Sequence, residues 1–467
     1  MNTSSSLGGQ GRCVVGGTVG GASVGRGALL ILAAATSTAR QHSVASVPAG
    51  GCPRRRRPRS VIRSDGKRWT GSTRLPEEVP GEAGVNMRIL VLGAGRMGLG
   101  AAYDLVHSPG VEAVTIADVD LERARDVARR VGSAKISPRR SDAGNYRQMV
   151  ALMRGHDAAV SCVVYHFNVQ LAQAAVEARV NFCDLGGNND VVAAELALDE
   201  AARAAGINII PDCGLAPGMV SILTARGAAC FEHLEVIHIR VGGLPQNPQP
   251  PLNYQIVFSV EGLINEYVER ARVIRRGQIM EVDSLTEIER LDFPPFGQME
   301  AFHTSGGTST LPESFLGRVE ELDYKTIRYP GHCEKFKTMV DLGLASSDAI
   351  TVDGVSIRPR RVLAELLSQR LPAGEPDVVL VRIEFRGVLE GKPQTLRYEI
   401  IDRFDEQTGL SAMMRTTAFP ASIVAQMMAR GEIEQNGAIP QERCVPPEVF
   451  VQELAKRNIH ISEQVVA

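Results

Sequence analysis

Three closely spaced glycines, Gly93, Gly95 and Gly98, lie in the segment GAGRMG, directly after the apolar run RILVL at 88–92. In a strand-turn-helix unit the first glycine permits a tight turn, the second lets backbone amides approach a pyrophosphate, and the third lets the helix pack closely on the strand. The segment therefore predicts a dinucleotide site formed by Gly93, Ala94, Gly95, Arg96, Met97 and Gly98.

An acid at the end of the next apolar run indicates which dinucleotide is bound. The run AVTIA ends at Asp118, where a carboxylate would accept hydrogen bonds from the hydroxyls of the adenosine ribose. A carboxylate at this place also repels a 2′-phosphate, although Arg96 and Arg123 lie nearby in the sequence. We expect NAD as the cofactor, with NADP as the less favoured alternative.

Polar residues follow the later strands of the same pattern. Parallel sheets bind ligands beyond the carboxyl ends of their strands, and those ends fall at Cys162 to His166, Asp184 to Asn188, and Asp212 to Gly218. We expect Cys162, Val163 and Asp184 to contact the cofactor. A capping or loop role is the alternative for each polar residue.

Two polar clusters lie further along the chain, GQMEAFHTSGGTSTLPESF at 297–315 and LDYKTIRYPGHCEKFK at 322–337. The first offers hydroxyls and backbone amides, and the second offers Lys325, Arg328, His332 and Lys335. Such groups suit an anionic guest, a carboxylate above all. The alternative for the basic residues is a solvated face with local ion pairs.

The elements that must position these residues alternate between strands and helices. We expect strands at 88–92, 113–117, 134–137, 158–164, 181–185 and 207–211, and helices ending near 107 and at 121–131, 145–154, 169–179 and 191–205. This alternation predicts an α/β fold with a doubly wound parallel sheet of the Rossmann type.

Longer strands and fewer helices follow position 217. We expect a helix to about 230, strands at 234–243, 254–260, 324–330, 378–388 and 394–404, and helices at 261–271, 332–342, 359–371 and 420–433. The pattern predicts a second, α+β domain with a mixed sheet. The expected division is an extension at 1–86, an NAD-binding domain at 87–216, a substrate domain at 217–410 and a segment at 411–467 that returns to the first domain.

Charge separates the first 86 residues from the rest of the chain. They contain 12 Lys and Arg against 4 Asp and Glu, and residues 1–64 contain no acid at all. This composition is typical of a transit peptide for a mitochondrion or chloroplast. The alternative is that translation starts at Met87 and the protein is cytoplasmic; disorder is expected of residues 1–86 in both cases.

The remaining composition excludes several classes of protein. The part from Met87 onwards is acidic, which gives it no reason to bind nucleic acid or an anionic membrane, and no run approaches the roughly 20 apolar residues of a membrane span. The eight cysteines form no C-x-x-C pair, which favours free thiols over a disulfide scaffold or a metal site.

Several longer sequence motifs resemble those of the saccharopine dehydrogenase superfamily, and most closely those of its lysine 6-dehydrogenase branch. They include GAGRMG, FCDLGG, IIPDCGLAPGM, VGGLPQNPQPPLNY, EAFHTSGGTSTLP and YKTIRYPGH, in a fixed order from Met87 to about Ser462. The resemblance implies a two-domain, NAD-dependent enzyme that is a homo-oligomer. Its second domain would serve substrate binding and dimerisation, with a small amino acid between the nicotinamide and that domain. Saccharopine dehydrogenases carry an acid in an L-D-P-G word, where this chain has Ala216, which favours the lysine branch.

The implied reaction is oxidation of the ε-amine of L-lysine, with release of ammonia, to a 6-semialdehyde that cyclises to 1-piperideine-6-carboxylate. The ε-ammonium has a pKa near 10.4, so deprotonating it at pH 7 costs roughly 4 kcal/mol, and a base must remove the proton unless the enzyme works at alkaline pH. Candidates for this role are His303, Asp212 and Tyr165, followed by His332 and His166.

Other residues are candidates for holding the substrate. Glu300, Asp184 or Glu261 could bind an ammonium group, whereas Arg328, Lys325, His332 and the hydroxyls and amides around Thr304 and Ser305 could bind the carboxylate. His303 as a core histidine is the structural alternative.

Two other functions stay open. One is a saccharopine or carboxynorspermidine dehydrogenase, and the other is a dinucleotide-binding regulator without turnover.

Overall fold

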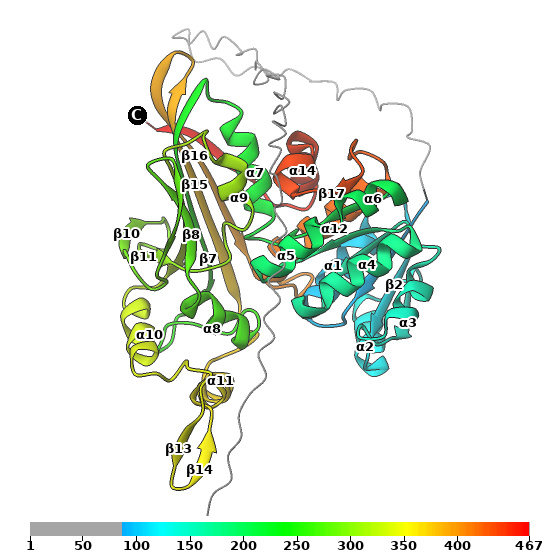
Figure 1. Ribbon diagram of the computed structural model, residues 1–467, viewed down its shortest axis with the longest axis horizontal. Coiled ribbons are helices and arrows are strands. Elements are labelled where there is room, and N and C mark those ends of the chain that lie inside the picture. The colour runs from blue at the N-terminus through cyan, green and yellow to red at the C-terminus, as the bar shows by residue number, and fades with distance from the viewer. Residues whose placement is uncertain (1–85, 467) are drawn as a thin grey trace, which may run out of the picture. The chain divides into compact units, whose positions relative to one another are not determined.

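The computed structural model describes residues 86–466 (Figure 1), so the expectations about the first 85 residues lie outside the described residues. The first sheet has seven parallel strands in the order β3-β2-β1-β4-β5-β6-β17. They are β1 (Met87–Leu92), β2 (Val111–Asp118), β3 (Ile136–Arg140), β4 (Ala158–Ser161), β5 (Asn181–Asp184), β6 (Asn208–Ile210) and β17 (Gly437–Ala438). The first six have the strand order typical of dinucleotide-binding sheets, so the predicted doubly wound fold is confirmed.

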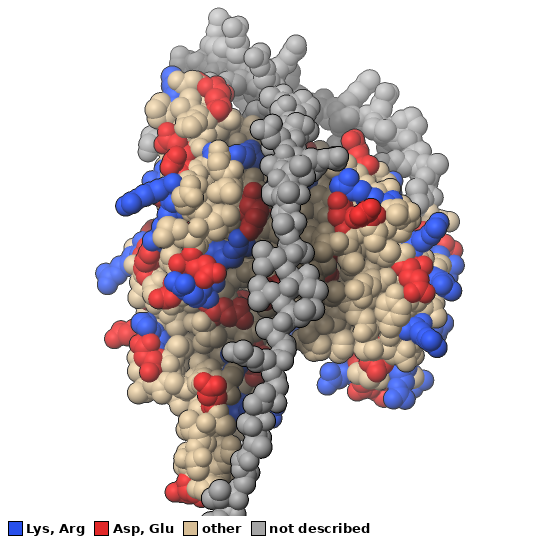
Figure 2. All heavy atoms as spheres, in the orientation of Figure 1, with Lys and Arg blue, Asp and Glu red and all other residues tan. Residues whose placement is uncertain are grey.

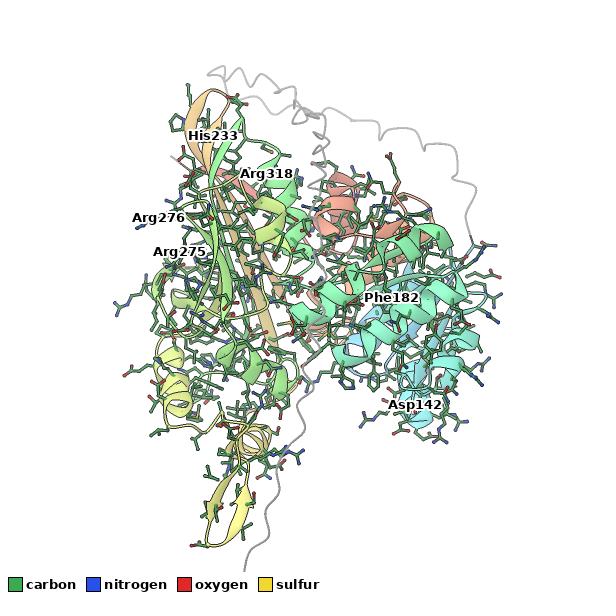
Figure 3. The ribbon with its side chains drawn as sticks, in the orientation of Figure 1. Asp142, Phe182, His233, Arg275, Arg276 and Arg318 are labelled. Carbon is green, nitrogen blue, oxygen red and sulfur yellow. The ribbon has the colours of Figure 1, made fainter. Side chains whose placement is uncertain are left out.

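Helices cover both faces of this sheet, because successive residues of a strand point to opposite sides. In β1, Ile89 and Val91 pack with α1 (Arg96–His107), α2 (Leu121–Val131) and α12 (Ala412–Ala429), whereas Leu90 and Leu92 pack with α3 (Tyr146–Met153) and α4 (Asn168–Ala178). Phe182 of β5, labelled in Figure 3, is fully buried between the strands and these helices.

Capping residues explain why the helix predicted at 121–131 begins and ends where it does. The side chain of Asp120 accepts a hydrogen bond from the amide of Glu122 at 2.9 Å, and Gly132 follows the last turn with a left-handed φ of 66°. Both are common end signals, which sequence alone reveals.

The single helix predicted at 191–205 is wrong, since the chain forms α5 (Asn189–Leu196) and α6 (Asp199–Ala205). The amide of Leu198 donates to the carbonyl of Glu195, three residues back, at 3.0 Å. This tightened last turn ends α5 and lets a new helix begin at Asp199.

The second sheet has nine strands and is mixed, as predicted. Its main order is β10-β11-β12-β7-β15-β16-β18, and β8 pairs with β12 and β9; β12 runs parallel to β7 while the other pairs are antiparallel. The strands are β7 (His233–Pro245), β8 (Ala271–Arg275), β9 (Gln278–Val282), β10 (Glu289–Asp292), β11 (Gln298–His303), β12 (Glu321–Arg328), β15 (Asp377–Leu389), β16 (Lys392–Arg403) and β18 (Ser462–Val466).

Helices near the second sheet include α7 (Met219–Ala228), which packs on β7 and β15, and α8 (Val260–Val268), on which α11 (Pro359–Arg370) packs. Two more helices are α9 (Leu311–Phe315) and α10 (His332–Asp341). A small hairpin, β13 (Ile350–Val352) with β14 (Val355–Ile357), precedes α11.

The strand predicted at 254–260 is wrong. Its residues form an extended segment with a single bridge, from Ile256 to Ala373, and α8 already begins at Val260. The amide of Ile256 donates to Pro372 O at 2.8 Å and the side chain of Gln255 donates to Glu375 O at 3.0 Å. The apolar alternation of this segment therefore reflects packing against the loop at 372–375 and not membership of a sheet.

The last part of the chain contributes to both sheets. Helix α12 packs on α1, β4 and β5, and β17 pairs with β6, whereas β18 pairs with β16 of the second sheet. Two more helices, α13 (Gln441–Cys444) and α14 (Pro447–Lys456), lie between these strands in the sequence. The expected boundaries at 216/217 and 410/411 stay predictions.

Within residues 86–466, no helix is long and apolar enough to cross a membrane. The same residues contain no group of three or more His, Cys, Asp or Glu side chains placed to hold a metal ion.

Candidate active site

The glycine turn between β1 and α1 has the shape that a dinucleotide requires. Gly93 has a φ of 97°, and a Cβ there would lie 2.8 Å from the carbonyl oxygen of Cys162. A Cβ on Gly98 would lie 1.8 Å from Gly93 O, whereas a Cβ on Gly95 would meet nothing within 4 Å. The turn is thus close-packed on the protein side and open at Gly95, and these residues fit a pyrophosphate at the start of α1.

The carboxylate of Asp118 lies against this turn. It accepts hydrogen bonds from the amide of Ala94 at 2.7 Å and from the amide of Asp120 at 2.9 Å. Arg96 instead donates to Ile256 O at 2.9 Å, and Arg123 lies 3.7 Å from Asp120. Neither arginine therefore forms an ion pair with Asp118 at the end of β2.

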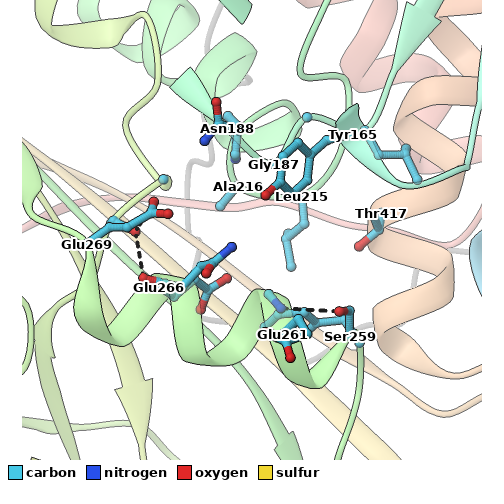
Figure 4. A pocket seen from close by; sticks show the side chains of 18 of the residues that line it. Tyr165, Gly187, Asn188, Leu215, Ala216, Ser259, Glu261, Glu266, Glu269 and Thr417 are labelled. Carbon is cyan, nitrogen blue, oxygen red and sulfur yellow. Dashed lines mark hydrogen bonds between the residues drawn. The ribbon is translucent and has the colours of Figure 1, made fainter. Parts of the chain in front are cut away.

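A cavity of about 940 Å3 lies beyond the carboxyl ends of β4, β5 and β6 and faces the second sheet. Figure 4 shows Tyr165 and Asn188 on one wall, and Glu266 of α8 and Glu269, which directly follows α8, on the other. The predicted site residues on its wall are Met97, Cys162, Val163, Tyr165, Asp212, Glu261, Ser305 and Arg328. The structure thus brings together residues of the predicted cofactor site and the predicted substrate site.

Arg328, at the end of β12, is the buried cation of this cavity. Its Nε donates to the hydroxyl oxygen of Tyr267 at 2.9 Å, and its guanidinium carbon lies 4.8 Å from the ring centre of Tyr254. The side chain is 3% exposed and forms no ion pair with any carboxylate of the described residues. A buried guanidinium that lacks a carboxylate partner and reaches a cavity is suited to a carboxylate ligand.

His332 lies behind Arg328 and does not line the cavity. Its Nδ1 lies 2.9 Å from Leu252 O, which can only accept, and its Nε2 lies 3.0 Å from the hydroxyl of Tyr267. Burial, with Arg328 next in importance, lowers the pKa of His332 to about 3, so the ring is neutral and Nε2 accepts the proton of Tyr267. His332 orients Tyr267, which orients Arg328, and the direct substrate contact expected of it is not found.

His303 and Lys325 lie on the opposite face of the second sheet from Arg328. They are paired across β11 and β12, and Lys325 is three residues from Arg328, so strand alternation puts the two on different faces. Lys325 donates to Glu287 O at 2.8 Å and to Glu289 at 3.1 Å, and His303 lies between Tyr324 O and Glu287. The catalytic role predicted for His303 and the substrate role predicted for Lys325 are therefore not supported by their positions.

Two more residues that were predicted to bind the substrate form hydrogen bonds within the protein instead. The carboxylate of Glu300 accepts the amides of Gly331 and Cys333 at 2.8 Å and 2.7 Å, and so caps α10. The hydroxyl of Thr304 lies 2.7 Å from that of Thr326 and is buried. The hydroxyl of Ser305, on the cavity wall, lies 3.4 Å from Glu269 Oε2.

A group of buried acids lies under the first-sheet wall. Asp184 is fully buried, does not line the cavity, and accepts the amides of Gly186 at 2.6 Å and Asp212 at 3.3 Å. Burial, then the charge of Asp184, raises the pKa of Glu195 to about 11, so Glu195 is protonated at neutral pH beside Asp184. Asp184 therefore organises the wall and does not touch a ligand in the cavity.

Asp212 is the acid of this group that reaches the cavity. It has a left-handed φ of 62°, its Oδ2 accepts a hydrogen bond from Ser309, and its Oδ1 has no partner among the described residues. Burial, followed by the charge of Asp184, raises the pKa of Asp212 to about 8. A carboxylate with such a pKa and an unpaired oxygen is able to accept a proton near neutral pH.

Tyr165 lies on the short helix η1 (Tyr165–Phe167), against Gly187, where a Cβ would lie 3.1 Å from its ring. Tyr165 lines the cavity, as Asp212 does. The ring centre of the neighbouring His166 lies 4.1 Å from that of Phe167, with the rings tilted by 44°, and His166 does not line the cavity.

Sequence reasoning missed Glu195, Glu266 and Ser309. Glu266 lines the cavity from α8, and burial, opposed by Arg328, raises its pKa to about 7. Glu266 and Glu195 resemble the ordinary acids of an amphipathic helix, so the sequence contains no signal for either. Ser309 stands within the predicted cluster at 297–315 but points to Asp212 across the two sheets.

Comparison with known families decides to which group the fold belongs. Residues 89–210 match the family model of the saccharopine dehydrogenase NADP binding domain, and residues 214–459 match that of the saccharopine dehydrogenase C-terminal domain. The chain belongs to the saccharopine dehydrogenase family. This membership confirms the predicted superfamily. The match of residues 89–210 also shows that the chain has a dinucleotide-binding domain.

Individual members of the saccharopine dehydrogenase family are distant from this chain. It is 21% identical to carboxyaminopropylagmatine dehydrogenase of Synechocystis sp. over 396 residues, an alignment that covers 80% of this chain and 96% of that protein. It is 23% identical over 395 residues to carboxynorspermidine synthase of Vibrio cholerae, over 77% of this chain and 93% of that protein. Apo saccharopine dehydrogenase (L-Glu forming) from Saccharomyces cerevisiae has the same fold, with a TM-score of 0.68 and 20% identity over 82% of this chain and 100% of that one.

Proposed function

We propose that this saccharopine dehydrogenase family member is an NAD-dependent oxidoreductase that acts on a CH–NH2 donor, the ε-amine of L-lysine. Its products are ammonia and the 6-semialdehyde, which cyclises to 1-piperideine-6-carboxylate. The observation that carries the proposal is the buried guanidinium of Arg328 in a cavity whose other charged groups are mainly acids.

The charges on the cavity wall match a substrate with one carboxylate and more than one amine. The lining contains two arginines, Arg328 and Arg360, of which Arg360 is paired with Glu261 at 2.9 Å. The lining acids are Asp212, Glu261, Glu266 and Glu269. Saccharopine carries three carboxylates, of which two would face this acidic wall without a cation, and Ala216 supplies no acid where the family pattern has one.

The chain's own residues supply positioning and proton transfer. Arg328 would hold the α-carboxylate, and the carboxylate of Asp212, which lines the cavity, would accept the proton of the ε-ammonium. Proton transfer from the ε-ammonium, with a pKa near 10.4, to ionised Asp212, with a pKa of about 8, costs about 3 kcal/mol. Glu266, with a pKa of about 7, is the alternative base, and Tyr165 is the third candidate.

The cofactor would be held by Gly93, Gly95, the start of α1 and Asp118, and its nicotinamide supplies the hydride acceptor. We favour NAD because the Asp118 carboxylate has no ion pair with a cation among the described residues and so repels a 2′-phosphate. The family model carries NADP in its description, so NADP is the alternative.

The direct test is oxidation of amines by the purified protein with NAD. We expect NADH to form with L-lysine and not with saccharopine. NADH that appears with saccharopine alone would overturn the choice of substrate. Protein that binds NADH and oxidises none of these amines would be a regulator without turnover.

One observation favours a second substrate class. Two relatives are named for carboxylated polyamine chemistry, and the acids Glu261 and Glu269 would accept further cationic groups. A carboxylated polyamine such as carboxynorspermidine therefore belongs in the same assay. A higher kcat/KM for it than for lysine would make this the function.

We also propose that the protein is a homo-oligomer. The β13–β14 hairpin exposes Ile350, Val352 and Val355, and the same region of Figure 2 carries few charged groups. Burying these side chains in another copy would remove apolar surface from water. Light scattering of the purified protein measures the mass, and a monomer at all concentrations would contradict the proposal.

A further inference from the structure

We propose that Ser309 is a positioning residue that fixes the carboxylate of Asp212, with one oxygen held by Ser309 and the other without a protein partner. The inference rests on the proposed role of Asp212 as proton acceptor. Ser309 itself would never touch the substrate, because it is 4% exposed and does not line the cavity.

The geometry divides the two oxygens of Asp212 between two tasks. The hydroxyl of Ser309 donates to Oδ2, whereas Oδ1 has no partner among the described residues. Oδ1 fills the place that a side chain on residue 186 would take, since a Cβ on Gly186 would lie 1.9 Å from it. Gly186 and Asp212 both line the cavity, and the unpaired oxygen is buried directly behind Gly186.

Both residues of this pair have an unusual backbone conformation. Asp212 has a φ of 62° and Ser309 a φ of 41°, in the left-handed region that favours glycine. Such conformations persist where the surrounding structure enforces them, and they gather at functional sites. Here a strained residue after β6 of the first sheet meets a strained residue of the loop between β11 and α9.

The loop that carries Ser309 is held on both sides. A Cβ on Gly307 would lie 2.4 Å from the ring of Tyr324, so the loop packs directly on that ring. The hydroxyl of Thr308 donates to Arg272 O at 3.1 Å, and that of Thr310 donates to Glu442 at 2.9 Å. Ser309 is therefore presented to Asp212 by a fixed loop.

The groups that face Asp212 are other acids. They are Asp184 at the end of β5, Glu195 of α5 behind it, and Glu442 of α13. No Lys or Arg in residues 86–466 forms an ion pair with Asp212. Burial, Asp184 and Glu442 raise the pKa of Asp212, and the hydrogen bond from Ser309 lowers it. Removing the hydroxyl must therefore raise this pKa further above about 8.

The sign of the effect on stability follows from linkage. Asp212 has a pKa near 3.9 in the unfolded chain and about 8 when folded, so its ionisation opposes folding as the pH rises to 8. Ser309→Ala leaves the protonated form nearly unaffected and penalises the ionised form. Above pH 8 the melting temperature of Ser309→Ala should therefore drop further and further below that of the wild type. Below pH 7 the difference in melting temperature should be smaller and constant.

The experiment measures melting temperature against pH for the wild type, Ser309→Ala, Ser309→Gly and the control Thr308→Val. Ser309→Gly also lacks the hydroxyl but suits the left-handed φ, so it guards against a simple folding defect. Thr308→Val removes a neighbouring hydroxyl that donates to a neutral carbonyl, and its effect should not vary with pH. A Ser309→Ala difference that stays constant from pH 6 to pH 10 would overturn the proposal.

Turnover supplies a second readout. With the NAD-loaded enzyme and lysine, the acid limb of kcat/KM should move to higher pH by about one unit in both Ser309 variants. If the acid limb of kcat/KM stays at the same pH and only the plateau of kcat/KM is lower, the role of Ser309 is merely structural. The melting curves need no substrate. If the enzyme does not oxidise lysine, the proposed function is wrong, but the melting curves still test the role of Ser309.

Discussion

The Nε atom of Arg328 donates to the hydroxyl oxygen of Tyr267 at 2.9 Å, which fixes the guanidinium at the wall of the cavity. The same oxygen lies 3.0 Å from Nε2 of His332, whose Nδ1 lies 2.9 Å from a backbone carbonyl. Each group in this series donates to the next, so the guanidinium is oriented without any carboxylate that would have to be displaced by substrate.

Replacing Arg328 tests its role as the carboxylate binder. Arg328→Met should lower kcat/KM for lysine by about tenfold to a thousandfold, because a charge-assisted hydrogen bond contributes about 1.5–3 kcal/mol and bidentate pairing adds to it. Steady-state kinetics measure the change. Lys325→Met is the matched control, since Lys325 lies on the same strand but on the opposite face, and the account is wrong if both variants lose activity equally.

The pH dependence of kcat/KM tests Asp212 as the base. The carboxylate must be ionised to accept a proton, so kcat/KM for lysine should rise with pH and level off above about 8. In Asp212→Asn the rise should continue towards about 10.4, where the amine loses its own proton.

Glu266→Gln serves as the comparison for Asp212, because Glu266 has a raised pKa of about 7 on the other wall. If kcat/KM still levels off at high pH in Asp212→Asn but no longer does so in Glu266→Gln, Glu266 is the base.

Asp118 controls the choice of dinucleotide. Asp118→Ala should raise the Kd of NAD by about tenfold or more, since a carboxylate on the ribose hydroxyls is lost, and it should affect NADP far less because the repulsion of the 2′-phosphate is lost too. Calorimetry with both cofactors measures the two constants. An equal loss for both would remove Asp118 from the adenosine site.

A buried ion pair fastens the end of the chain to the first sheet. Asp104 of α1 accepts from Arg457 at 2.6 Å and from Ser422 of α12 at 2.6 Å. Asp104→Ala should lower the free energy of unfolding by about 3–5 kcal/mol, because Arg457 stays buried with part of its charge uncompensated.

Urea denaturation measures the effect at Asp104. Arg129→Ala breaks an exposed pair with Asp126 and should cost less than about 1 kcal/mol. Equal losses in the two variants would contradict the claim that the buried pair joins the segments.

The first sheet could be predicted because its signals are local. The glycine turn, Asp118 and the end signals of α2 each depend on a few neighbouring residues, and the strand-end rule placed Asp212 and Tyr165 at the cavity. The second sheet carries weaker signals, and short strands such as β9 and β10 escaped notice. The segment at 254–260 has the alternation of a strand but packs against a loop.

The face of a strand could not be predicted from a cluster of basic residues. Lys325 and Arg328 are three residues apart, so at most one of them can face the cavity, and nothing local says which. Ser309 acts through Asp212, which lies 97 residues away in the sequence, and only the fold brings this pair together.

The most direct test of the central claim uses L-lysine labelled with 15N at the ε-amine, NAD and the purified protein. The account predicts labelled ammonia and NADH in equal amounts, because the ε-amine is the group that is oxidised and released. Unlabelled ammonia, or no NADH with lysine while a carboxylated polyamine or saccharopine is oxidised, would contradict it.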